Sequence, residues 1–180
     1  MPATPFPGFD SPAVGFEQPY EMLEACHARV QRSLDLLSRL VTHVDERGHD
    51  AQTRSAAADV LRYFDIAAPL HHADEEVHVF PLLLAQGNTE VRAAVLSLQD
   101  DHRRMSALWA SLRQTLLRWS QPGVDEGVDE ASRRAVASFH GIYAKHLKTE
   151  EGLVFPSARA LMNENDLASM SRQMQARRQT

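Results

Sequence analysis

Hydrophobic residues recur at alternating intervals of four and three along four long stretches of the chain. This spacing places a stripe of apolar side chains on one face of a helix, which is typical of helices that pack in a bundle. The predicted helices span about residues 19–47, 51–85, 89–120 and 129–161. A shorter amphipathic stretch at about 164–178 predicts a fifth helix. We therefore expect an all-α fold: an up-down-up-down antiparallel four-helix bundle over residues 19–162, followed by a short C-terminal helix within 163–180.

Glycine and proline mark the ends and irregularities of the predicted helices. Gly48 and Gly87 each follow a periodic stretch, where glycine commonly ends a helix. Pro69 lies inside the second helix and removes the hydrogen bond to the carbonyl of Asp65, which predicts a kink. Pro81 should disturb the last turn of the same helix.

Residues 1–18 differ in composition from the rest of the chain. They are rich in proline, which excludes a helix, and they hold three phenylalanines. The segment is predicted to be a proline-rich N-terminal arm whose phenylalanines pack on the bundle. A disordered leader is the alternative, and the sequence leaves both open.

Polar residues interrupt the apolar stripes at a few positions. The stripe of the second helix ends in His71, Glu75, His78 and Leu82, and that of the fourth ends in Tyr143, His146, Glu150 and Leu153. His27 lies in the stripe of the first helix and His102 in that of the third. Burying such groups without partners is costly, so their presence on the inward faces needs an explanation.

Two stretches of the chain are copies of one another. The pattern His-x-x-x-Glu-Glu-x-x-x-Phe-Pro occurs at residues 71–81 and again, 75 positions later, at 146–156. The same offset relates His27 to His102. Each half of the chain therefore supplies a single histidine followed by a His-x-x-x-Glu pair, and incidental histidines would not be expected in two equal copies.

In an antiparallel bundle, the positions of the turns place the histidines and glutamates of both halves at the same level along the bundle axis. Residue 50, in the first turn, lies midway between His27 and the His71/Glu75 pair, and the later turns are placed in the same way. In the pairs, a histidine and a glutamate four positions apart share one helix face. Four imidazoles and two carboxylates should therefore converge in the core.

A metal centre would satisfy these six groups. The predicted ligands are His27, His71, Glu75, His102, His146 and Glu150. Imidazole with carboxylate suits iron, zinc, manganese or nickel. Six protein ligands exceed one tetrahedral zinc site and suit two six-coordinate ions, with each glutamate able to bridge. With an oxo or hydroxo bridge as well, about two coordination positions stay open for a further ligand.

Several neighbours of the predicted ligands have less definite roles. His78 has Leu153 as its counterpart in the repeat, which favours contact with the ligands over metal binding. Tyr143 could donate a hydrogen bond to a bound molecule or merely pack in the core. The remaining neighbours point about 100° away from the ligands and are either in contact with them or solvated; they are His72, Glu76 and Glu151.

Composition narrows the environment and the partners. The formal net charge of −5 has no block of like charges, which argues against nucleic-acid and membrane-surface binding. No apolar stretch approaches the roughly 20 residues of a membrane span. A single cysteine, Cys26, excludes an internal disulfide and fits a reducing compartment. The N-terminus lacks the pattern of a signal peptide, so a cytoplasmic location is predicted.

The paired motif resembles that of the hemerythrin-like (HHE cation-binding) domain family, over roughly residues 20–160. The resemblance implies that the six predicted ligands hold two iron ions in an oxo- or hydroxo-bridged non-haem di-iron centre. It also implies dioxygen or nitric oxide as the small ligand. Oxygen-carrying hemerythrins place a second histidine on the third helix, where this chain has Met105 or Ser106, and this departure argues against reversible oxygen carriage.

Three functions compete on these grounds, and the sequence leaves any protein partner unknown. The first is a di-iron protein that binds or senses dioxygen or nitric oxide. The alternative is a di-iron oxidoreductase that acts on peroxide or nitric oxide, or in iron and oxidative-stress repair. The third is a ferritin-like iron oxidase, because Glu24-x-x-His27 and Glu75-x-x-His78 match the Glu-x-x-His string of those bundles. The second half of the chain does not repeat that string.

Overall fold

The computed structural model describes residues 15–179, and all regular structure in that range is helical, which confirms the all-α class. The helices are α1 (Pro19–Arg47), α2 (Ala51–Arg62), α3 (Ala68–Asp74), α4 (Phe80–Gln86), α5 (Thr89–Trp119), α6 (Glu130–Thr149), α7 (Phe155–Leu161) and α8 (Glu164–Arg177). Three π-helical turns join some of them: η1 (Tyr63–Ala67), η2 (Glu75–Val79) and η3 (Glu150–Val154). Most of the predicted N-terminal arm lies outside the described residues.

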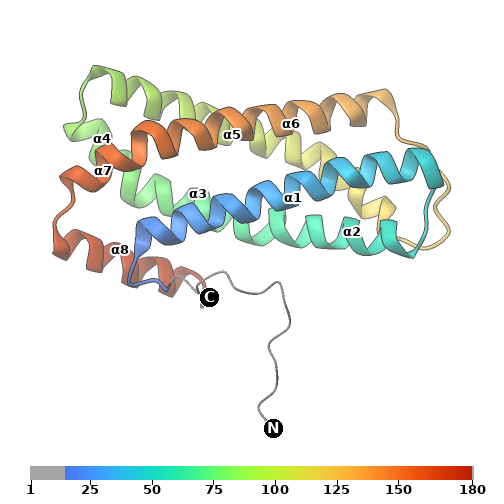
Figure 1. Ribbon diagram of the computed structural model, residues 1–180, viewed down its shortest axis with the longest axis horizontal. Helices are drawn as coiled ribbons and strands as arrows, with labels where there is room; N and C mark the ends of the chain where they lie inside the picture. Colours follow the sequence, from blue (N-terminus) through green and yellow to red (C-terminus); the bar gives the residue numbers. More distant parts are fainter. Residues whose placement is uncertain (1–14, 180) are drawn as a thin grey trace, which may run out of the picture.

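The helices form four rods that lie side by side along the long axis of the molecule (Figure 1). Two rods are single helices, α1 and α5, and the others are the runs from α2 to α4 and from α6 to α7. α1 packs against α2 and α6, and α5 packs against the same two helices. The rods thus form a closed bundle, with α8 beside the start of α1 at one end.

Short polar side chains start the helices at the turns. Asp50 accepts a hydrogen bond from the backbone N–H of Thr53, and the Thr53 hydroxyl accepts one from the backbone N–H of Asp50, which together cap α2. Asn88 and Asp129 accept equivalent bonds at the starts of α5 and α6. α1 ends at Gly48, whose φ of 73° is a conformation that favours glycine.

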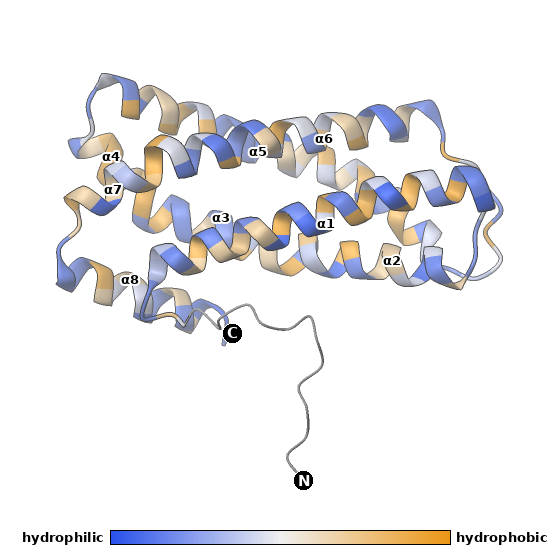
Figure 2. Ribbon diagram, viewed as in Figure 1, coloured by the Kyte–Doolittle hydropathy of each residue, from blue (hydrophilic) through white to orange (hydrophobic). Residues whose placement is uncertain are grey.

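Apolar side chains fill the bundle on both sides of a polar middle section. One cluster surrounds Leu34, Leu116 and Trp119, and the other surrounds Leu23 and Phe155. Along each rod, hydrophobic and hydrophilic residues alternate with the helical period (Figure 2). Within residues 15–179, no helix combines the length and the apolar character that crossing a membrane requires.

Each π turn ends two positions before a proline. η1 comes before Pro69, η2 before Pro81 and η3 before Pro156. Proline has no N–H, and its ring collides with a carbonyl of the preceding turn, so a wider turn accommodates it. In η2, for example, the N–H of Phe80 bonds to the carbonyl of Glu75, five positions back. Near Pro69, where a kink was predicted, the helix has such a turn.

The π turns move the buried stripe by one residue beyond each glutamate. The sequence pattern predicted His78, Leu82 and Leu153 on the inward face, but all three are only partly buried. Fully buried positions, each 0% exposed, include Val79, Leu83, Val154 and Ala158. A π turn holds more residues than an α turn, so the inward face arrives later in the sequence. Leu82 and Leu153 thus lie at the edge of the inward face, where they still pack against the cluster around Leu23 and Phe155, and His78 is also only partly buried.

α8 is attached to the bundle by apolar and ionic contacts. Met170 and Met174 are buried against the cluster that contains Phe155. At the end of the helix, Arg177 and Arg178 both donate to the fully buried carboxylate of Asp74, the latter at 2.7 Å. Asp74 directly precedes Glu75, so α8 contacts the bundle next to the predicted metal ligands.

Candidate metal centre

The structure brings all six predicted ligands together in the polar middle section of the bundle. Their exposed fractions are 3% for His27, 1% for His71, 0% for Glu75, 7% for His102, 1% for His146 and 0% for Glu150. α1 and α5 each contribute one histidine, and the two longer rods each contribute a His/Glu pair at the junction with a π turn. The two halves of the sequence repeat thus meet at one place.

The ligand atoms form two groups that share both carboxylates. One group is His27, His71, Glu75 and Glu150, and the other is Glu75, His102, His146 and Glu150. Within each group the atoms lie within 4.8 Å of one another. Each group therefore has two imidazoles of its own, and Glu75 and Glu150 lie where they could bridge two ions.

The individual separations agree with a metal-binding arrangement. Two donor atoms at right angles on one ion, with bonds of about 2.1 Å, lie about 3 Å apart. The observed Nε2-to-oxygen distances are 3.2 Å for His27–Glu150, 3.2 Å for His71–Glu75, 3.0 Å for His146–Glu150 and 3.5 Å for His102–Glu75. The Nε2 atoms of His102 and His146 lie 3.2 Å apart.

Several of these buried atoms have no hydrogen-bond partner. They include both carboxylate oxygens of Glu75 and Glu150 and the Nε2 atoms of His27 and His71. Burying a polar atom without a partner costs about 1–3 kcal/mol, and more for a charged group. Metal ions would satisfy all of them at once, and imidazole with carboxylate is a donor set that iron accepts. The residues present therefore fit a pair of ions.

The electrostatics of the centre point the same way. Burial and the neighbouring Glu150 carboxylate raise the pKa of Glu75 well above its usual range. Burial also acts to raise the pKa of Glu150, but the nearby imidazoles of His146 and His27 outweigh it and hold that pKa well below its usual range. Burial lowers the pKa of His71 to about 3. Two cations would remove the repulsion between the carboxylates and favour neutral imidazoles.

Two further glutamates hold the single histidines from behind. The Nδ1 atom of His27 lies 2.8 Å from Glu151 Oε1, and that of His102 lies 2.9 Å from Glu76 Oε1. Gln99 donates a hydrogen bond of 2.9 Å to the other oxygen of Glu76. These bonds leave both Nε2 atoms aimed at the centre, which is how outer carboxylates orient ligating histidines. The sequence left contact and solvation open for these glutamates; both are in contact.

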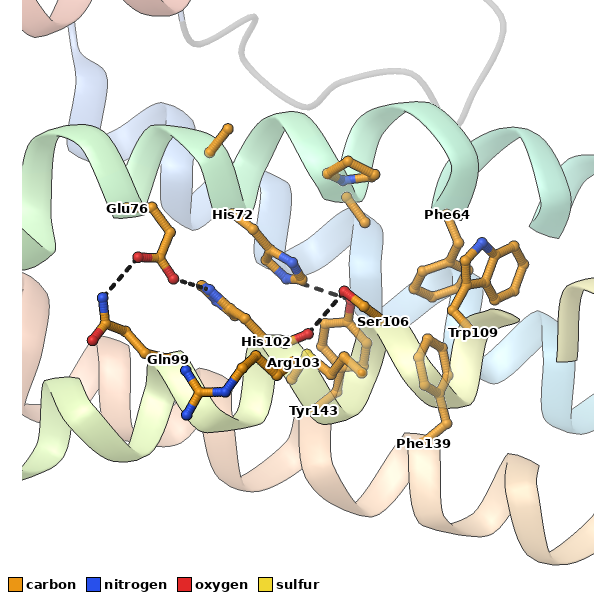
Figure 3. A pocket seen from close by; sticks show the side chains of 14 residues that line it. Phe64, His72, Glu76, Gln99, His102, Arg103, Ser106, Trp109, Phe139 and Tyr143 are labelled. Atoms are coloured by element: carbon orange, nitrogen blue, oxygen red, sulfur yellow. Dashed lines mark hydrogen bonds and ion pairs between the residues drawn. The ribbon is translucent and has the colours of Figure 1, made fainter. Parts of the chain in front are cut away.

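His72 and Tyr143 lie beside the His102 side of the centre (Figure 3). The ring of His72 stacks on that of His102 with centroids 4.0 Å apart, and its Nε2 lies 3.5 Å from the Tyr143 hydroxyl. A nitrogen of His72 also falls within 4.8 Å of ligand atoms of His102 and His146. Burial raises the pKa of Tyr143 well above its usual range, so the phenol stays protonated. The sequence left contact and solvation open for His72 as well. The repeat could not decide between them, because the counterpart of His72 is Leu147.

His78 lies away from the centre, because the π turn rotates it off the inward face. Among the described residues it belongs to none of the groups that could hold an ion. Its Nε2 is buried without a hydrogen-bond partner, and burial followed by the nearby positive charge of Arg177 lowers its pKa.

Comparison with known proteins agrees with the resemblance and the geometry. The chain is 30% identical over 164 residues to an uncharacterized protein of Haemophilus influenzae, covering 91% of this chain and 92% of that protein. The model of the hemerythrin HHE cation-binding domain matches residues 18–158, which include both copies of the motif and all six buried ligand-type residues. On this match, the protein belongs to the hemerythrin HHE cation-binding family.

Proposed function

We propose that the protein is a non-haem di-iron protein that binds or senses dioxygen or nitric oxide. The observation that carries this proposal is the pair of four-residue groups that share Glu75 and Glu150. A single ion would leave buried donor atoms of one group without a partner. Two ions, one held by each group with Glu75 and Glu150 shared, would give the donor atoms of both groups a partner.

In this proposal each iron has its own pair of histidines. His27 and His71 would hold one iron, and His102 and His146 would hold the other. When bound, the ions supply the affinity for a diatomic ligand and the capacity for electron transfer. The protein aims the Nε2 atoms of the imidazoles inward, and the burial of the centre limits its contact with bulk water. This assignment presumes the up-down-up-down course predicted for residues 19–162, and a cytoplasmic location stays a prediction from the sequence.

A di-iron oxidoreductase acting on peroxide or nitric oxide is the second candidate. The Tyr143 hydroxyl supports it, because a protonated phenol next to the centre can donate a hydrogen bond or a proton to a bound molecule. Turnover of hydrogen peroxide by the diferric protein separates the two candidates. The ferritin-like candidate loses support, because Glu24 is half exposed and pairs with Arg159, while His78 lies outside the groups.

The test is the metal content and optical spectrum of protein produced in iron-supplemented medium. We expect about two irons per chain and near-ultraviolet bands that bleach on reduction and return in air. His146→Ala should lose iron, whereas His140→Ala, on the same helix but 38% exposed, should not. One zinc per chain, or no metal in a folded protein, refutes the proposal.

A further inference from the structure

Two hollows flank the metal centre, one on each side of the bundle. The first, between α3 and α5, has a volume of about 620 Å³, and its lining includes His72, His102 and Ser106. The second, between α1 and α6, has a volume of about 650 Å³, and its lining includes His27 and Leu147. Their sizes are alike, so size does not select the side from which a small molecule reaches the centre.

The sequence repeat relates the two hollows residue by residue. His102 of the first corresponds to His27 of the second, 75 positions apart, and both touch the centre. The two copies differ at several of the lining positions: His72 corresponds to Leu147 and Ser106 to Gln31, while Arg103 corresponds to Ala28. The first hollow thus combines an imidazole with a small side chain, where the second has an apolar and a longer side chain.

The first hollow is also lined by aromatic rings. They include those of Phe64, Trp109 and Phe139, and the hydroxyl of Tyr143 lies beside His72 (Figure 3). Charged side chains line both hollows, including Glu76 and Arg103 in the first and Glu24 and Lys148 in the second, whereas the phenylalanine, tyrosine and tryptophan rings belong to the first. A hollow with an apolar floor and a few polar groups near its inner end is the usual form of a small-molecule site.

The orientation of His72 argues against metal binding by its ring. Its plane is inclined by only 18° to that of His102, with the centroids 4.0 Å apart. The lone pair of an imidazole nitrogen lies in the ring plane. Two nearly parallel, stacked rings cannot direct such lone pairs at the same ion, so His72 covers the face of His102 while its own nitrogen faces Tyr143.

We propose that small ligands reach the centre only through the hollow between α3 and α5, on the side of His102, and that His72 and Tyr143 are positioning residues that hydrogen-bond the incoming ligand. This inference rests on the proposed di-iron function and adds the side of entry and two residues to it. The ligand class is a small molecule or anion with one atom for the metal and a second atom that accepts a hydrogen bond.

The test uses azide, a small anion of this class, titrated into the diferric protein and followed by its charge-transfer band. His72→Leu gives this side the residue of the other side, and Ser106→Gln does the same at the position that corresponds to Gln31. Tyr143→Phe removes only the hydroxyl. The matched control is Gln31→Ser, which makes the reverse change in the second hollow. Iron content and the melting temperature are measured for each variant.

We expect two irons and one azide per wild-type chain. His72→Leu, Tyr143→Phe and Ser106→Gln should keep both irons and weaken azide binding about tenfold or more, while Gln31→Ser should match the wild type. Unchanged azide affinity in His72→Leu and Ser106→Gln overturns the inference, as does a loss in Gln31→Ser. Loss of iron from His72→Leu also overturns it, because His72 would then be a ligand.

The inference and the proposed function fail in different measurements. Absence of two irons from the wild-type protein refutes the di-iron function before any azide is added. A wild-type protein with two irons that binds no azide refutes the inference alone.

Discussion

Glu76 and Glu151 are the residues that connect the metal centre to the surface of the bundle. Each is partly exposed, yet each holds the outer nitrogen of a buried histidine at 2.8–2.9 Å. A carboxylate in this place fixes the tautomer of the ring and increases its basicity. The doubled glutamate of the repeated motif therefore has two tasks, because the first member faces the centre and the second holds a histidine of another helix.

Removing either outer carboxylate should weaken metal binding without unfolding the protein. We expect Glu76→Ala and Glu151→Ala each to lower iron(II) affinity by roughly 10–100-fold. Glutamine at the same positions should restore part of the affinity, because its amide oxygen still accepts the hydrogen bond. Competition with a chromogenic chelator measures the change, and Glu46→Ala, at an exposed position of α1, is the control. Equal affinities in all variants would contradict this role.

Asp50 gives the stability of the metal-free protein a defined response to acid. The backbone N–H of Thr53, and after it the His43 ring, lower the pKa of Asp50 from 3.8 to about 2. Because the folded state favours the ionised form, the cap stabilises the protein above about pH 4, and this contribution is lost as the pH falls through 2.

Asp50→Ala should therefore melt about 2–4 °C below the wild type at pH 6. The difference should shrink between pH 4 and pH 2, where the wild-type cap becomes protonated. Thermal unfolding of metal-free protein at several pH values measures it, with the exposed loop variant Asp125→Ala as control. A gap that stays constant down to pH 2 would show that the Asp50 charge does not contribute.

At the scale of single residues, the sequence repeat predicted which six side chains come together. The same spacing occurs twice, so the prediction did not depend on the exact winding of any one helix. It could not place His72. The angle of a side chain around its helix depends on local winding, and the counterpart of His72 in the repeat is an apolar residue.

At the scale of elements, the π turns determine which residues face inward beyond the metal centre. η2 and η3 begin at Glu75 and Glu150, the two shared carboxylates. The long helices were predictable because each apolar stripe repeats over many turns. The π turns were not predictable from the sequence. Proline near the end of a helix has several structural outcomes, and the apolar stripe beyond each turn is too short to show that it is shifted by one residue.

The register after η2 can be tested with two adjacent leucines. Leu83 is 0% exposed, while Leu82 is only partly buried. Leu83→Ala should lower the free energy of unfolding by about 2–5 kcal/mol, and Leu82→Ala by clearly less. Urea denaturation of metal-free protein measures both. If Leu82→Ala were the more costly change, the helix would follow the regular α-helical register instead.

At the scale of the whole molecule, α8 links the end of the described chain to the middle of the second rod. Asp74 is fully buried, and its partners Arg177 and Arg178 lie more than a hundred positions later in the sequence. The sequence predicted α8 as an amphipathic helix. The pattern did not predict that the end of α8 contacts Asp74, because a single acidic residue next to the ligand motif has many possible partners.

Arg178→Met should lower the free energy of unfolding by about 1–3 kcal/mol, because it leaves the buried Asp74 carboxylate with fewer partners. It should also speed hydrogen exchange in α8. Arg172→Met, at an exposed position of the same helix, should change neither quantity. Equal stability of the two variants would show that the ion pair does not hold α8.

The attachment of Asp74 to α8 also has a consequence for the order of events during protein synthesis. The ribosome makes both histidine–glutamate pairs before it makes Arg177 and Arg178, so a nascent chain already holds every predicted ligand while Asp74 lacks its cations. An uncompensated carboxylate resists burial, and this keeps the rod next to His71 and Glu75 from its final packing. Final packing beside the candidate metal centre is therefore expected only after α8 has been translated.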